Sequence, residues 1–146
     1  MLDVGRALIA GFVATVVISM LMIMRVSAGI MSWFRPIEIM DLTAQELFGT
    51  PDSAVLGWLL HFIVGTVIWG GLFLLLEHRL PGGSYTRRGL VFGTGAWLAV
   101  MVIVFPLAGS GLFGLGFGLI VPITTMITHW IFGAVLGASY GWLRSL

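Results

Sequence analysis

A long stretch without a charged side chain, residues 89–142, is the feature that most constrains the fold of this chain. The stretch contains no Asp, Glu, Lys or Arg, and His129 is its only histidine. About 20 consecutive apolar residues suffice for one helix to cross a bilayer, so this stretch is long enough for more than one crossing. It therefore predicts an integral membrane protein.

The composition supports the same class. Hydrophobic residues make up 59% of the chain and charged residues only 9%, whereas a soluble domain carries about 25% charged residues. A net charge of +1 excludes a nucleic-acid-binding protein on electrostatic grounds. Without cysteine there is no disulfide framework, no thiolate chemistry and no cysteine metal site. We expect a single membrane domain, residues 1–146.

Hydropathy and length predict an all-α protein with four transmembrane helices. The expected spans are about residues 4–24, 53–76, 88–107 and 119–143. Pro51, Asp52 and Ser53 form a helix-entry cluster before the second span, and Leu-Pro-Gly-Gly at 80–83 ends it. The first span is expected to be retained, because its apolar run is longer than that of a typical signal peptide.

The distribution of arginine predicts the orientation. If both termini and the 77–86 loop share one side, that side holds five of the seven arginines: Arg6, Arg79, Arg87, Arg88 and Arg144. The other side holds only Arg25 and Arg35. Basic residues accumulate in cytoplasmic loops, so we expect a multi-pass protein with cytoplasmic N- and C-termini.

The first outer connection is predicted to contain a short amphipathic helix at the membrane surface, about residues 33–49. Thr43 and Glu46 match a capping box, and Gly49 is a plausible helix end. The pattern places Ile37, Met40, Leu47 and Phe48 on the apolar face and Glu38, Asp41, Gln45 and Glu46 in water. An ordinary solvated loop remains the alternative. The second outer connection, residues 108–118, is glycine-rich and uncharged, and must pack on protein to satisfy its backbone.

A short internal repeat relates the two halves of the chain. Residues 61–65 read His-Phe-Ile-Val-Gly and residues 129–133 read His-Trp-Ile-Phe-Gly. Each motif lies in the second helix of a two-helix unit. We therefore expect two units related by an axis along the membrane normal, with His61 and His129 at similar depths.

Small residues at four-residue spacing predict how the helices meet, because they let helix backbones approach closely within a membrane. The expected helix-packing glycines are Gly57, Gly65, Gly89, Gly93, Gly133, Gly137 and Gly141. They fit a compact four-helix bundle, and a homo-oligomer or docking onto other membrane subunits is the alternative.

The two intramembrane histidines, His61 and His129, are the candidate functional residues, because ionisable groups are costly inside a bilayer. In one hypothesis they bind a haem b or a metal ion, and the glycine four residues after each leaves room for a porphyrin. A proton-transfer, copper or small-ligand role is a further alternative. In the structural interpretation, neutral imidazoles hydrogen-bond to Thr125, Thr128, Tyr140 or backbone carbonyls. No cofactor and no dedicated metal site is expected.

Five segments carry a resemblance to a known family. They are Gly57-Trp58-x-x-His61-Phe62-x-x-Gly65, Arg79-Leu80-Pro81-Gly82, Gly89-Leu90-Val91-Phe92-Gly93, residues 106–114, and His129-x-x-Phe132-Gly133 with the four residues that follow. The chain resembles a family of bacterial four-helix inner-membrane proteins of unknown function over about residues 5–143. The resemblance implies a bacterial inner-membrane location and this topology, and it assigns no catalytic residue.

Together these observations predict a protein that is not an enzyme. We expect a small accessory or stabilising subunit of a larger membrane complex, such as a respiratory or other redox complex. Its partners would be the lipid bilayer and other membrane subunits or further copies of itself. The alternatives are a bis-histidine haem or metal electron carrier using His61 and His129, and a small oligomeric channel or transporter.

Overall fold

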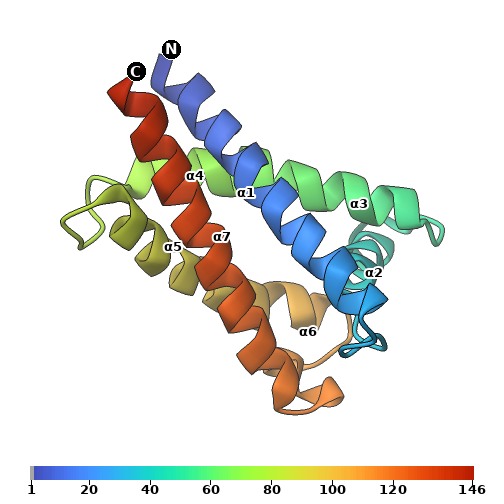
Figure 1. Ribbon diagram of the computed structural model, residues 1–146. Coiled ribbons are helices and arrows are strands. Elements are labelled where there is room, and N and C mark those ends of the chain that lie inside the picture. The colour runs from blue at the N-terminus through green and yellow to red at the C-terminus, as the bar shows by residue number, and fades with distance from the viewer. Residues whose placement is uncertain (1) are drawn as a thin grey trace.

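A computed structural model describes residues 2–146, and within this range the chain forms helices and no strands (Figure 1). Four helical stretches are long and apolar enough to cross a membrane, which confirms the predicted four-span all-α fold. The first is α1 (Leu2–Ser27) and the fourth is α7 (Ile120–Ser145). The second joins α3 (Ala54–Ile63), the π-helical segment η1 (Val64–Trp69) and α4 (Gly70–Leu76). The third joins α5 (Tyr85–Ala99), the π-helical segment η2 (Val100–Val104) and α6 (Phe105–Leu107).

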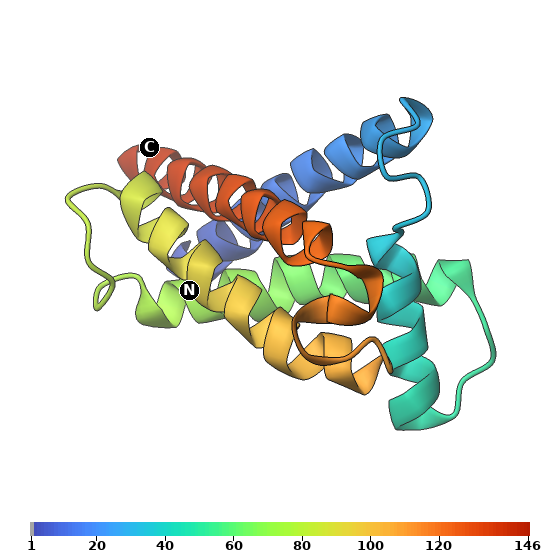
Figure 2. The ribbon, with the colours of Figure 1, turned by 90° about the horizontal axis from the view of Figure 1, so that it is seen from below.

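Both termini lie at one end of the bundle, beside the turn that links the second and third spans (Figure 1). An ion-pair network joins all four spans there. The Glu77 carboxylate lies 2.6 Å from Arg88 and 3.5 Å from Arg144, and Arg144 lies 3.9 Å from Asp3. The opposite end carries the helix α2 (Pro36–Phe48) and the connection into α7 (Figure 2).

Small residues let α1 pack closely on the second span. A Cβ atom on Gly11 would lie 2.8 Å from the Thr66 carbonyl oxygen, and one on Gly70 would lie 2.9 Å from the Ala7 carbonyl. Gly65 is contacted by the side chain of Thr15. The backbones therefore touch where a larger side chain would hold them apart.

The helices α5 and α7 meet along a second glycine seam. A Cβ on Gly89 would overlap the Gly133 carbonyl, and a Cβ on Gly133 would overlap the Gly89 carbonyl. Gly93 lies against the His129 carbonyl, and Gly137 lies against the Tyr85 carbonyl. Further along α7, Gly141 contacts the Tyr85 ring. In both halves of the chain, the glycine four residues after the histidine thus contacts the first span of its own half.

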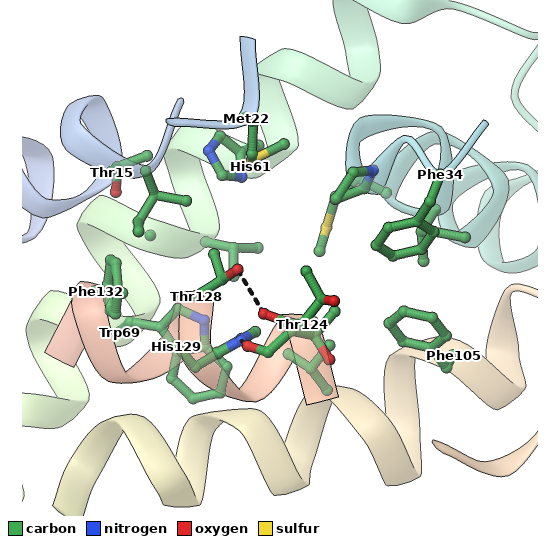
Figure 3. Close-up of a pocket in the computed structure, with 18 of the residues that line it drawn as sticks. Thr15, Met22, Phe34, His61, Trp69, Phe105, Thr124, Thr128, His129 and Phe132 are labelled. Atoms are coloured by element: carbon green, nitrogen blue, oxygen red, sulfur yellow. Dashed lines mark hydrogen bonds between the residues drawn. The ribbon is translucent and has the colours of Figure 1, made fainter. Parts of the chain in front are cut away.

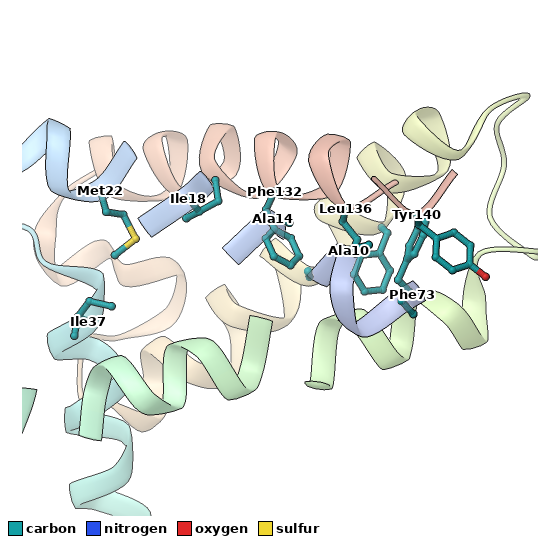
Figure 4. Packing of buried hydrophobic residues seen from close by; sticks show 12 residues of the cluster. Ala10, Ala14, Ile18, Met22, Ile37, Phe73, Phe132, Leu136 and Tyr140 are labelled. Carbon is teal, nitrogen blue, oxygen red and sulfur yellow. The ribbon is translucent and has the colours of Figure 1, made fainter. Parts of the chain in front are cut away.

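The main hydrophobic core runs along α1, between α7 and the second span (Figure 4). Alanines at positions 7, 10 and 14 of α1 are almost fully buried, which brings α1 close to its neighbours. Phe73 and Tyr140 are fully buried, and their rings pack edge to face at 5.6 Å. Large ring pairs therefore fill the core where the small residues of α1 leave space.

The helix α2 occupies the predicted segment but begins and packs differently. Pro36 is its first residue, and it ends at Gly49, which adopts a left-handed conformation at φ 65°. The predicted capping box is wrong, because Thr43 lies in the middle of the helix and its hydroxyl donates to the Ile39 carbonyl. Gly57 of the second span lies against the Ile37 carbonyl of α2, so this glycine meets the outer helix. The location of α2 at the membrane surface stays a prediction.

The polarity assigned to α2 was also partly wrong. Asp41, expected in water, is 4% exposed, whereas Leu47 and Phe48 are exposed. The Asp41 carboxylate accepts hydrogen bonds from the Ser53 backbone N–H at 3.1 Å and from the Gln45 side chain at 2.7 Å. It is buried because it fixes the turn that leads into α3.

Candidate functional site

A cavity of about 110 Å³ lies where α1, α2 and the last three spans converge (Figure 3). Its wall is mainly apolar and includes the aromatic side chains of Phe34, Trp69 and Phe105. The polar side chains Thr15, Thr128, His61 and His129 also line it. The structure therefore brings the two predicted histidines to one cavity.

The hydrogen bonds of His61 define its protonation. Its Nε2 lies 3.1 Å from the Ser19 hydroxyl oxygen, and that hydroxyl also lies 2.8 Å from the Thr15 carbonyl. A carbonyl can only accept, so the single proton of the Ser19 hydroxyl goes to Thr15. The His61 Nε2 must then be the N–H donor to Ser19. This assignment leaves a lone pair on the Nδ1 of His61.

His129 is fixed by its own helix. Its Nδ1 lies 2.8 Å from the backbone carbonyl of Thr125. Because a carbonyl has no proton to give, Nδ1 carries the N–H and Nε2 keeps its lone pair. Nε2 lies on the side of the ring away from this bond. A backbone carbonyl on the other ring nitrogen is also what orients histidines that bind a ligand or a metal ion.

Three of the four threonines of the cavity wall, Thr15, Thr125 and Thr128, likewise donate their protons to the helix backbone, and Thr124 donates to the Met31 sulfur. The Thr15 hydroxyl donates to the Gly11 carbonyl at 2.7 Å, and the Thr128 hydroxyl donates to the Thr124 carbonyl at 2.8 Å. Each of these hydroxyl oxygens can therefore act only as a hydrogen-bond acceptor for another group.

Arg25, the charged residue of this wall, holds the turn between α1 and α2. It donates to the carbonyls of Ile30 at 3.2 Å, Met31 at 2.7 Å and Phe34 at 2.6 Å. Arg25 lines both this cavity and a neighbouring pocket between α1 and the start of α3. Its position places a cation at the end of the cavity nearer α2.

Both π-helical segments border the cavity. Val64, Gly65 and Trp69 of η1 and Val100 of η2 line its wall. Such irregular turns break the regular hydrogen bonding of a helix and recur at functional sites. Their position favours this cavity over other parts of the bundle as the functional centre.

The haem hypothesis does not fit these residues. It required Gly65 and Gly133 to leave room for a porphyrin beside each histidine. Instead, the Thr15 side chain fills the space over Gly65, and the Gly89 backbone fills the space over Gly133. Among residues 2–146 no three His, Cys, Asp or Glu side chains form a group suited to hold a metal ion.

The two histidines were predicted from the sequence, whereas most of the residues around them were not. Thr15 and Ser19 carry a signal, because they share the four-residue spacing of the α1 packing face. Nothing in the sequence pattern distinguishes Arg25, or the two π-helical segments, from ordinary helix and loop residues.

The fold and the cavity together define a class: a four-span helical membrane protein with an internal cavity lined by two histidines. The chain belongs to a family of unknown function, DUF6789, which matches residues 1–146. This membership agrees with the resemblance noted in the sequence. No curated protein and no solved structure matches the chain.

Proposed function

We propose that the protein is a non-catalytic membrane protein that binds a small lipid-soluble molecule in the cavity between its spans. The observation that carries this proposal is the cavity itself, because His61 and His129 both reach it and each keeps one ring nitrogen free. Mostly apolar cavities with a few converging polar groups are the usual form of small-molecule sites.

A cavity-filling variant tests the proposal. Val64→Phe adds a ring at the cavity wall, whereas Val67→Phe adds the same ring at a position that is 54% exposed on the same π-helical segment. A ligand that copurifies with the gently solubilised protein should be lost from Val64→Phe and kept by Val67→Phe. Equal retention in both variants, with both folded by circular dichroism, refutes a ligand bound in this cavity.

A second candidate function, an accessory subunit of a larger membrane complex such as a redox complex, is favoured by the second span. Only 17% of its most apolar window is buried, against 44% for the first span and 33% for each of the others. Such a face could contact a partner subunit as well as lipid. A photo-crosslinking residue at Leu59, which is 55% exposed, should yield a protein adduct in native membranes. Adducts with lipid alone would refute this candidate.

The proposed location is a bacterial inner membrane with cytoplasmic termini. The arginine bias and the shared end of both termini support this orientation. Because the chain lacks cysteine, single introduced cysteines report the orientation without labelling of native residues. An impermeant maleimide added to intact cells should label Gly49→Cys and leave Gly83→Cys unlabelled, and the reverse pattern would refute the orientation.

A further inference from the structure

The polar atoms of the cavity indicate which kind of ligand it binds, and this inference rests on the function proposed above. Seven polar or charged side chains line the wall: Thr15, Arg25, His61, Thr124, Thr125, Thr128 and His129. Arg25 is bound to backbone carbonyls of its own turn, and each threonine and histidine directs a proton to a neighbour within the protein. The threonine oxygens and the imidazoles therefore offer acceptors, and a bound molecule gains most from them if it brings a donor.

The unused nitrogen of His129 is one of two free imidazole acceptors, the other being the Nδ1 of His61. Its Nδ1–H is held by the Thr125 carbonyl at 2.8 Å, so the ring cannot easily turn, and Nε2 faces away from that carbonyl. An imidazole lone pair left without a donor in an apolar wall costs free energy, which a ligand hydroxyl would recover.

The size and lining of the cavity restrict the rest of the molecule. A volume of about 110 Å³ is close to the roughly 150 Å³ of an apolar cavity known to hold one benzene ring. Met22 and Met40 line the wall, and their flexible thioethers can give way to a ring. The aromatic faces of Phe34, Trp69 and Phe105 suit a planar guest.

We infer that the cavity binds a lipid-soluble molecule with a hydroxylated six-membered ring, a phenol or hydroquinone, whose O–H donates to the Nε2 of His129. A quinone or an aryl ether of the same shape lacks the O–H and leaves the imidazole unpaired.

Two probes test the inference: 4-methylphenol and its methyl ether, 4-methylanisole, in which a methyl group replaces the hydroxyl proton. Binding to the full chain in lipid nanodiscs is measured by ligand-observed NMR, with partition into empty nanodiscs subtracted. One neutral hydrogen bond corresponds to about a 2- to 10-fold preference for the phenol. Equal affinities would overturn the hydroxyl inference and keep the binding function, whereas no binding of either probe would overturn both.

A histidine variant locates the acceptor. His129→Phe keeps a ring of similar size and removes the lone pair, so the phenol should lose its advantage while the ether binds as before. His78→Phe, at an exposed position in the turn after α4, is the matched control and should keep the preference. If His129→Phe does not fold, the comparison of the two probes on the unaltered chain still decides. A preference that survives in folded His129→Phe would overturn the role of this nitrogen.

Discussion

Two glycines two residues apart in α5 provide a sharp test of the helix packing. Gly93 lies against the His129 carbonyl of α7, and an added Cβ there would overlap that oxygen. Gly95 has nothing within 4 Å of an added Cβ. The same change, Gly→Ala, therefore meets backbone at one position and open space at the other.

The expected magnitudes follow from this difference. Replacing glycine by alanine inside a helix stabilises by about 0.5–1 kcal/mol, and Gly95→Ala should show this gain. Gly93→Ala makes the same gain but must push two backbones apart, at an overpacking cost of about 1–3 kcal/mol. The two variants should therefore differ by about 1–3 kcal/mol in free energy of unfolding, with Gly93→Ala the less stable.

Equilibrium unfolding in bicelles, followed by circular dichroism, measures this difference. Gly71→Ala in α4, where an added Cβ also meets nothing within 4 Å, serves as a second control. If Gly93→Ala were as stable as Gly95→Ala, the close contact between α5 and α7 would be refuted.

Three further predictions concern polar contacts outside the cavity. Glu77→Gln should lower the free energy of unfolding by about 1–3 kcal/mol, because it leaves the half-buried Arg88 without its carboxylate partner. An unchanged unfolding midpoint would contradict this prediction. Trp97→Phe removes an indole N–H that donates to the Pro122 carbonyl at 3.1 Å. The free energy of unfolding should fall by about 1 kcal/mol in the same assay, and an unchanged value would show that this hydrogen bond does not stabilise the fold. The hydrogen bond and charge repulsion from Asp41 raise the pKa of Asp52. A raised carboxyl pKa stabilises the fold below the unfolded value near 3.8, and this stability is lost as the pH rises through the folded pKa. In a pH series, the free energy of unfolding of the unaltered protein should therefore fall relative to that of Asp52→Asn over that window. Parallel pH curves for the two proteins would contradict the interaction between Asp52 and Asp41.

The sequence predicted the four spans because their apolar runs are long and their charges lie outside them. The glycine spacing also anticipated where backbones come close, as at Gly89 and Gly133. The same spacing misled the haem hypothesis, because it does not reveal whether a ligand or another helix fills the space beside a glycine.

The environment of single polar residues could not be predicted from the pattern. Asp41 lies at a helical position that is expected to face water, and its contact with Ser53, twelve positions away, explains its burial. The cavity likewise depends on contacts between distant parts of the chain. Thr15 and Thr128 are ordinary helix residues in sequence, and they become one wall only when α1 packs across α7.

Extraction of native protein tests most directly whether the cavity holds a hydroxylated, lipid-soluble ligand. The unaltered chain, Val64→Phe and Val67→Phe would be purified from their own membranes in nanodiscs, and the bound small molecules identified by mass spectrometry. One hydroxyl-bearing ring compound, near one per chain, is expected in the unaltered protein and in Val67→Phe, and it should be absent from Val64→Phe. The same set of molecules in all three preparations would contradict it.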